Sequence, residues 1–141
     1  MTTFKQLTSG LLVSGIIIFS GCKKDDAPKI DPRDTFVGEY VAEDCFGFEE
    51  DLEIEKDSKN DKNIIIHSEN MAEFYNLEEV EAEVSGSEFS FEEEYSYEFD
   101  SETIEGVLKG KGKLNGKDLT IDIKFTEDGD SDECDITGEK K

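Results

Sequence analysis

Residues 104–125 read IEGVLKGKGKLNGKDLTIDIKF and predict a β-hairpin. Apolar or glycine residues alternate with polar residues on both sides of Asn115-Gly116, and an Asn-Gly pair between two alternating runs is the strongest short signal for a hairpin turn. A turn at these two residues would gather the apolar side chains on one face and pair opposite charges on the other. The facing pairs of this register are Gly106–Phe125, Leu108–Ile123, Gly110–Ile121 and Gly112–Leu119 on the apolar face, and Lys113–Asp118 and Lys109–Asp122 on the polar face.

The preceding segment predicts a second hairpin, which turns at Ser85-Gly86. In the strand that follows, residues 89–99, the odd positions carry aromatic side chains and the even positions are polar, which is the alternation of a half-buried strand. Glu93 is the one odd position that is not aromatic. The facing pairs expected for this hairpin are Ala82–Phe89 and Val80–Phe91.

The rest of the chain after residue 35 also has the pattern of short strands joined by tight turns, with no helical pattern long enough for a βαβ unit. About eight strands result, with one helical turn or lid expected at residues 69–78. Sequential hairpins predict an all-β, up-and-down antiparallel meander that closes as a small barrel. A flattened two-sheet sandwich has the same strand pattern and stays open as the alternative. Besides the two hairpins, strands are expected at residues 36–45, 48–55, 64–66 and 133–139.

The first 21 residues predict a secretory signal peptide. Lys5 supplies the positive start, residues 11–19 form a short apolar run, and small residues lead into Cys22. That run is too short to cross a bilayer core of ~30 Å as a helix. Residues 22–34 contain both prolines and many charges, which predicts a flexible tether. Residues 35–141 then form one acidic β domain.

The end of the signal segment resembles the lipobox of bacterial lipoproteins. Residues 19–22, Phe-Ser-Gly-Cys, have the small residues and the cysteine of that motif, although phenylalanine stands where leucine is usual. Residues 24–26, Lys-Asp-Asp, resemble the lysine-plus-acidic export signal of surface lipoproteins of the Bacteroidota type. The resemblance implies cleavage before Cys22, a lipid on that residue, and an outer-membrane protein exposed at the cell surface.

The β domain is similar to small lipocalin-like lipoproteins of the same group. The similarity rests on turns and alternation, and it implies location and fold without supplying any catalytic residue. The segments that carry it are residues 36–45, 84–86, 110–116 and 133–134.

The cysteine count agrees with this compartment. The chain has three cysteines, an odd number for a protein of an oxidising space. If Cys22 carries the lipid, Cys45 and Cys134 remain as a pair near the two ends of the domain. We therefore expect a Cys45–Cys134 disulfide that ties the first strand to the last.

The composition is strongly acidic, with 37 Asp and Glu against 15 Lys and Arg and a formal charge of −22. Such a charge argues against nucleic acid or an anionic membrane surface as a partner, because both would repel the domain. Two interpretations stay open, a surface that only keeps the protein soluble and one that captures cations or a basic partner.

The candidate ligand-binding residues are Glu93, Tyr95 and Tyr97. In an uninterrupted strand Glu93 points inward among aromatic rings, where a desolvated carboxylate would have a raised pKa and could bind or protonate a ligand. A bulge or strand break at Glu93 would instead turn its side chain to solvent.

Residues 128–133 resemble a fragment of a calcium-binding loop, because Asp128, Asp130 and Asp132 alternate. The distal glutamate and the flanking helices of an EF-hand are absent, so only weak Ca²⁺ binding would be expected there. An ordinary Asp-Gly hairpin turn is the alternative. No other cofactor is expected.

The sequence favours a non-enzymatic protein, since a lone histidine, His67, gives no catalytic triad. We expect a lipid-anchored, monomeric envelope domain that binds a small ligand, a glycan or a protein partner. The alternative is a structural accessory of an outer-membrane complex without a ligand of its own. An enclosed apolar cavity lined by Tyr95, Tyr97 and Phe99 would favour the ligand binder, and a filled interior with an exposed apolar edge would favour the accessory.

Overall fold

The computed structural model describes residues 29–141. The predicted signal peptide (residues 1–21), Cys22 and the first residues of the predicted tether lie outside this part of the chain. Within residues 29–141, no helix has both the length and the apolar character that crossing a bilayer requires.

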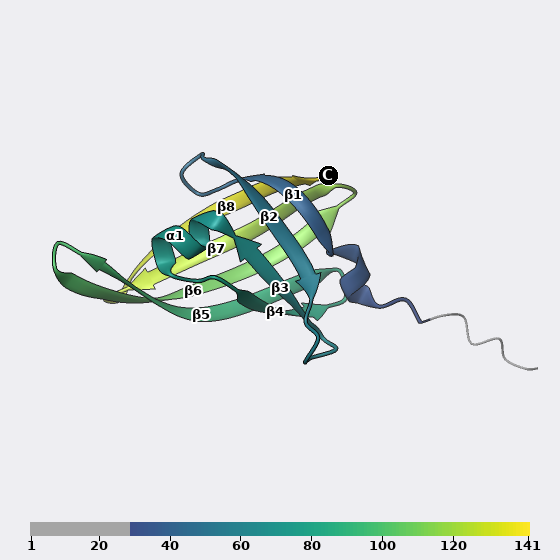
Figure 1. Ribbon diagram of the computed structural model, residues 1–141, viewed down its shortest axis with the longest axis horizontal. Helices are drawn as coiled ribbons and strands as arrows, with labels where there is room; N and C mark the ends of the chain where they lie inside the picture. Colours follow the sequence, from purple (N-terminus) through teal and green to yellow (C-terminus); the bar gives the residue numbers. More distant parts are fainter. Residues whose placement is uncertain (1–28) are drawn as a thin grey trace, which may run out of the picture.

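The strands follow one another around a closed antiparallel barrel, each paired with its neighbours in the sequence (Figure 1). β1 and β8 complete the barrel through pairing that runs from Tyr40–Lys140 to Glu43–Thr137. The predicted all-β, up-and-down barrel is confirmed, and the sandwich alternative is wrong because one continuous sheet closes on itself. The strands are β1 (Gly38–Glu43), β2 (Glu49–Lys56), β3 (Asn63–Ser68), β4 (Val80–Ser85), β5 (Glu88–Phe99), β6 (Glu102–Asn115), β7 (Asp118–Glu127) and β8 (Asp130–Lys140).

The connections divide between two ends of the barrel (Figure 1). The near end, where the described chain begins, carries the 3₁₀ helix η1 (Pro32–Thr35) and the turns at residues 57–62, 86–87 and 116–117. The far end carries the loop at residues 44–48, helix α1 (Glu69–Tyr75) and the turns at residues 100–101 and 128–129. Segments distant in the sequence therefore meet at the far end.

The interior of the barrel is filled by side chains, to which every strand contributes. Phe36 closes the near end: it is fully buried, and its ring meets that of Phe89 edge-on with centroids 5.1 Å apart. The hydroxyl of Tyr40 donates a hydrogen bond to the Phe36 carbonyl and holds this plug in place. An interior cavity at the far end has a volume of about 20 Å³, room for one water-sized group.

Glycines of β6 make room for the aromatic rings of β5. Gly112 pairs with Phe89 and Gly110 pairs with Phe91, and each ring lies where a Cβ on the facing glycine would stand. Rings that cover strand glycines regain packing area that a glycine alone cannot supply. The aromatic residues of β5 and the glycines of β6 are therefore complementary, since each ring fills the space above a glycine.

Both predicted hairpins form, but each register differs from the predicted one by two residues. In the β6–β7 pair, Gly110 faces Ile123 and the turn consists of residues 116–117. Gly116 has φ +67° and is the first turn residue, the position that a type II′ turn gives to glycine, whereas a turn at Asn115-Gly116 would have placed glycine second. A shift of two residues keeps every side chain on its predicted face. In the other hairpin the pairs are Glu83–Ser90, Val84–Phe89 and Ser85–Glu88.

The change in register removes the two charge pairs predicted across the β6–β7 hairpin. Lys113 faces Thr120, and Lys109 faces Lys124, so neither lysine meets the predicted aspartate. The lysines of β6 pair instead with glutamates on its other neighbour, β5. These exposed ion pairs are Lys109–Glu92 at 2.9 Å and Lys111–Glu88 at 2.8 Å.

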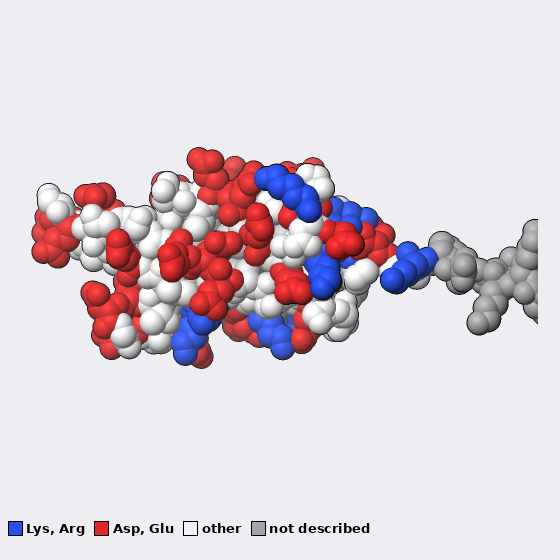
Figure 2. Space-filling view, turned by 90° about the horizontal axis from the view of Figure 1, so that it is seen from below, with Lys and Arg blue, Asp and Glu red and all other residues white. Residues whose placement is uncertain are grey.

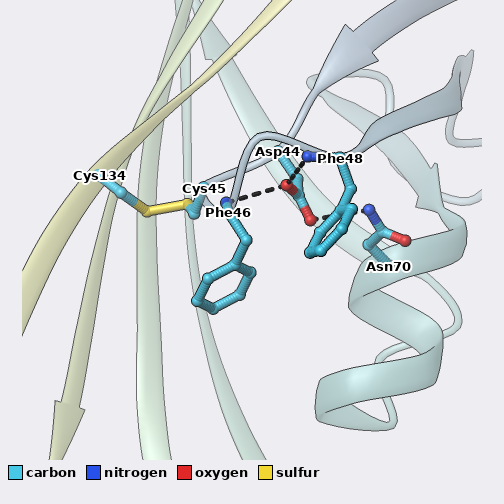
Figure 3. The surroundings of a disulfide bond; sticks show 6 residues. All are labelled: Asp44, Cys45, Phe46, Phe48, Asn70 and Cys134. Carbon is cyan, nitrogen blue, oxygen red and sulfur yellow. Dashed lines mark hydrogen bonds between the residues drawn. A yellow bond between two sulfur atoms is a disulfide. The ribbon is translucent and has the colours of Figure 1, made fainter.

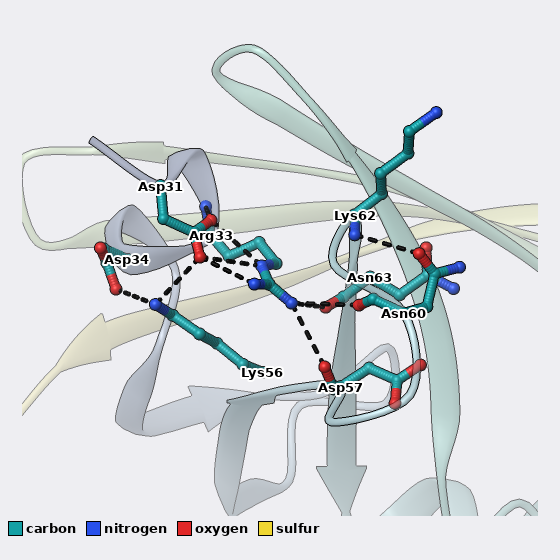
Figure 4. A network of polar contacts seen from close by, with 8 residues as sticks. All are labelled: Asp31, Arg33, Asp34, Lys56, Asp57, Asn60, Lys62 and Asn63. Atoms are coloured by element: carbon teal, nitrogen blue, oxygen red, sulfur yellow. Dashed lines mark hydrogen bonds and ion pairs between the residues drawn. The ribbon is translucent and has the colours of Figure 1, made fainter. Parts of the chain in front are cut away.

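The flexible tether predicted over residues 22–34 ends earlier than expected, because residues 31–34 are held against the barrel (Figure 4). Asp31 caps η1 by accepting from the Arg33 backbone N–H at 3.0 Å. The Arg33 guanidinium donates to the Asn60 carbonyl at 3.0 Å, in the turn after β2, and Lys56 lies 3.1 Å from Asp31. Hydrogen bonds from Arg33 hold the pKa of the Asp31 carboxyl well below its usual range. The ordered domain therefore includes η1.

The helical turn expected at residues 69–78 is confirmed as α1. Ser68 caps its start, with the hydroxyl accepting from the Met71 N–H at 3.1 Å. Asn76 ends the helix in the left-handed conformation, at φ 56°. The buried side chain of Met71 fixes α1 across the far end of the barrel.

Candidate functional site

An open groove of about 650 Å³ lies at the far end of the barrel. Aromatic side chains from the 44–48 loop, α1, β5 and β7 line it together with carboxylates of the β7–β8 hairpin. Among the described residues that line it there is no lysine, arginine or histidine. We call it the acidic groove, and its aromatic and acidic residues are Phe46, Tyr75, Tyr97, Phe125, Glu127, Asp128, Asp130, Asp132 and Glu133.

Two tyrosine hydroxyls meet the carboxylate of Glu127 in this groove, and a third tyrosine, Tyr75, packs beside them. The Tyr95 hydroxyl donates to Glu127 Oε1 at 2.6 Å, and the Tyr97 hydroxyl lies 3.5 Å from the same oxygen. The Tyr75 ring meets the Tyr95 ring edge-on with centroids 5.1 Å apart. Burial raises the pKa of Tyr75 to about 12, and burial together with the bond to Glu127 raises the pKa of Tyr95. The structure thus brings the predicted residues Tyr95 and Tyr97 together with Glu127, which the sequence did not single out.

Glu93 does not join this cluster. β5 continues without a bulge past Glu93, which faces Leu108 on β6, so the predicted break is wrong. The side chain nevertheless stays half-buried, and Oε1 accepts from the Glu81 N–H of β4 at 3.3 Å. Because the pairing of β4 with β5 has ended at Ser90, the carboxylate bonds to the β4 backbone in the open part of the sheet. Glu93 is therefore half-buried on the inward side of an unbroken strand, and its binding role stays a prediction.

The three alternating aspartates lie in and after a tight turn. Asp128 and Gly129 have φ 49° and 91°, the two positive angles of a type I′ hairpin, which matches the Asp-Gly turn alternative. β8 begins at Asp130, three residues earlier than predicted, and so includes Asp132. Within residues 29–141, no group of three or more His, Cys, Asp or Glu side chains is arranged to hold a metal ion. The aspartates contribute their charge to the acidic groove.

The predicted Cys45–Cys134 disulfide is confirmed (Figure 3). Both of its cysteines line the groove. The bridge joins the 44–48 loop to β8 beyond the end of the β1–β8 pairing, with Cα atoms 5.4 Å apart. Asp44 fixes the same loop by accepting from the N–H groups of Phe46 at 2.9 Å and Phe48 at 2.8 Å. The rings of Phe46 and Phe48 are 63% and 61% exposed. The bridge and Asp44 therefore hold the Phe46 ring at the rim of the groove, and Phe48 is exposed on the same loop.

The raised tyrosine pKa values predict loss of stability at alkaline pH. Burial raises the pKa of Tyr40 and of Tyr75 from 10.0 to about 12, so between these values the unfolded chain loses protons that the folded chain keeps. The free energy of unfolding should stay level up to pH 10 and fall as the pH rises to about 12. Urea unfolding at a series of pH values, with tyrosinate absorbance recorded in parallel, measures the decrease. Tyr75→Phe should make the decrease shallower, and tyrosines that ionise near pH 10 in the folded protein would contradict the expectation.

Comparison with protein-family models, with curated proteins and with solved structures finds no match to this chain. The candidate function therefore depends on the chemistry of the far end and not on relatives. The resemblance of residues 19–26 to lipoprotein signals stays a prediction, because these residues lie outside the described part.

Proposed function

We propose that this protein is a lipid-anchored, non-enzymatic envelope protein that binds a basic segment of another protein in the acidic groove. The observation that carries the proposal is the groove itself, in which one exposed and three half-buried aromatic rings lie beside five carboxylates. No basic residue of the described part lines the groove, and Lys124 on its border pairs with Glu133 at 3.5 Å. Lysine and arginine side chains are attracted both to carboxylates and to aromatic faces. A basic, extended segment is the occupant whose chemistry this lining complements.

The charge distribution supports a basic partner. On the face drawn in Figure 2, carboxylates cover the whole length of the domain, whereas most lysines and arginines lie in the half toward the grey segment, so the opposite end is almost entirely acidic. Such a field raises the association rate of a positively charged partner and directs it toward the far end.

The filled interior favours recognition at the surface over storage of a ligand inside the barrel. Tyr95 is buried against Glu127 and does not line an enclosed cavity, and Phe99 is 69% exposed at the tip of the β5–β6 hairpin. The interior cavity of about 20 Å³ is far smaller than the ~300–1,000 Å³ of small-molecule sites.

The position of the described N-terminus suits an anchored protein of this kind. η1 lies at the near end (Figure 1). The acidic groove lies at the far end, because the 44–48 loop and the β7–β8 turn line it. A lipid on Cys22 would hold the near end toward the membrane and leave the groove facing away from it. The lipid would also keep an acidic domain at a surface that otherwise repels it.

The anchor predicts a clear result for Cys22→Ala. This variant should leave the membrane fraction, because one residue supplies the attachment point for the lipid. Ser14→Ala, in the predicted apolar run, should remain in the membrane fraction and serves as the control. Cell fractionation followed by immunoblotting measures the distribution, and membrane association of Cys22→Ala would rule out the proposed anchor.

The groove predicts selective loss of peptide binding when its charge is reduced. Asp130→Asn combined with Asp132→Asn should weaken the binding of fluorescein-labelled octalysine about tenfold, because two surface charge contacts supply ~1–2 kcal/mol. Fluorescence anisotropy at an ionic strength of ~0.15 M, where long-range attraction is screened, measures the dissociation constant.

The matched control is Glu81→Gln combined with Glu83→Gln, which makes the same change of charge on the exposed face of β4. This pair should alter the dissociation constant less than about twofold. Equal losses from the two pairs would show unspecific attraction to the acidic surface and contradict the proposal. Binding of neutral cellohexaose in the groove without binding of octalysine would indicate a glycan receptor, and binding of neither would favour the accessory role.

A further inference from the structure

The carboxylate of Glu50 is buried at the far end with one oxygen unpartnered. Glu50 lies on the inward face of β2 in line with Leu52 and Ile54, and it is 5% exposed. Its Oε2 accepts from the Ser68 hydroxyl at 2.6 Å and from the Asn70 N–H at 3.2 Å. No donor of the described residues reaches its Oε1. A buried carboxylate oxygen without a donor is costly, and its presence calls for an explanation.

Asp44, the second buried carboxylate here, is connected to Glu50 through Asn70. Asp44 is 8% exposed, and its Oδ2 accepts from the Asn70 side-chain amide at 2.8 Å. Asn70 thus binds one carboxylate through its backbone N–H and the other through its side chain. None of the ion pairs formed within residues 29–141 includes Asp44 or Glu50. Two buried negative charges therefore share neutral donors and have no positive partner in the described part of the chain.

A cavity of about 20 Å³ lies beside these carboxylates, lined by both of them and by mostly apolar side chains. Phe46 and Phe74 also line it, and these two rings are 63% and 43% exposed, with centroids 6.4 Å apart. The cavity therefore lies directly below a surface pair of aromatic rings. It shares Phe46 and Tyr75 with the acidic groove, so a peptide in the groove would pass over it.

We infer that this cavity is a binding site for a primary ammonium group, with Glu50 Oε1 as its acceptor. The inference rests on the proposed function, since it assigns a lysine side chain of the basic partner to a defined place. The ammonium would donate to Glu50 Oε1 and supply the missing positive charge. Its alkyl stem would lie between Phe46 and Phe74, whose faces also attract a cation.

The size of the cavity and its unpartnered acceptor favour a primary ammonium over a guanidinium or Ca²⁺. An ammonium group is compact and has three donors, whereas a guanidinium is a wide planar fork. Ca²⁺ prefers six to eight oxygen ligands, which two carboxylates already bonded to Ser68 and Asn70 cannot provide. The cavity has the volume of a single water-sized group, which suits the head of a primary ammonium better than a guanidinium.

The first test uses n-butylammonium chloride with the ¹⁵N-labelled protein. Saturable shifts of the Asn70 backbone and side-chain amide signals are expected, and an equal concentration of potassium chloride should not produce them. Glu50→Gln should weaken this binding at least about tenfold, since a hydrogen bond to a charged group is worth more than ~1.4 kcal/mol. Glu53→Gln, the same change at an exposed position of β2, should leave the binding unchanged. Absence of saturable shifts in the folded wild-type protein would overturn the inference without any variant.

The second test compares octalysine with octaarginine. Octalysine should bind about tenfold more tightly to the wild-type protein, and Glu50→Gln should remove this preference. Equal affinities of the wild-type protein for octalysine and octaarginine would overturn the lysine site. The proposed function would still stand if Asp130→Asn combined with Asp132→Asn weakens octalysine binding. Butylammonium binding that depends on Glu50, without any binding of octalysine, would support the ammonium site with a free amine as its ligand.

Discussion

Replacing Cys45 and Cys134 together by alanine is expected to lower the free energy of unfolding by ~4–5 kcal/mol. The bridge joins residues separated by 89 positions, and in the chain-entropy model a disulfide restricts the unfolded chain more as the loop becomes longer. Domains of this size have total stabilities of ~5–15 kcal/mol, so the variant would retain only a small margin. Thermal unfolding followed by circular dichroism should show a Tm lower by roughly 15–30 °C.

The same variant should also lose affinity for octalysine, because the bridge holds the loop that carries Phe46. Cys22→Ala leaves both bridged cysteines in place and should keep the Tm of the parent protein. Intact mass after thiol blocking without reductant should show no blocked thiol at Cys45 or Cys134 in the parent. A Tm of the double variant within a few degrees of the parent would show that pairing of β1 with β8 closes the barrel without the bridge.

Much of the fold follows from the sequence because a strand alternates side chains with a strict period of two. That period identifies the inward residues of both hairpins even though both registers are shifted by two residues, since such a shift preserves the faces. The register itself depends on which turn residue adopts a positive φ, and an Asn-Gly pair allows glycine to stand first or second. The observed position of Gly116 decides this, and the predicted charge pairs fail with the predicted turn.

The candidate site is less accessible to sequence reasoning, because it is assembled from segments far apart in the chain. Tyr95 and Tyr97 belong to a conspicuous aromatic alternation and could be predicted as candidates. Glu127 and Glu50 are two of 37 acidic residues, and nothing in their local sequence marks them. Glu50 is distinguished only by its inward position on β2 and by the cavity beside it.

The contacts of Arg33 at the near end could not be predicted from the sequence either. A proline-containing charged segment has the composition of a tether, and only the barrel turn around Asn60 supplies the carbonyl that fixes its guanidinium. The composition therefore predicts the character of the segment, whereas the contact that ends the tether depends on the folded sheet.

Gly110→Ala combined with Gly112→Ala is expected to destabilise the barrel by roughly 4 kcal/mol. A Cβ at either glycine would occupy space taken by the Phe91 or the Phe89 ring, and overpacking of a core position costs ~1–3 kcal/mol. The backbone of neither glycine has a positive φ, so the cost comes from the rings and not from backbone strain. Urea unfolding at neutral pH measures the loss.

A double-mutant cycle with Phe89→Leu and Phe91→Leu separates this cause from an unspecific loss of strand stability. Each leucine alone should destabilise the parent, because it leaves unfilled volume above a glycine. In the alanine background the same leucines should restore part of the lost stability, since the smaller side chain leaves space for the new methyl group. The two pairs of substitutions should therefore be non-additive by more than ~1 kcal/mol. Additive losses would contradict this packing explanation. They would mean that the glycines of β6 are needed for the bend of the strand and not to leave space for the rings of β5.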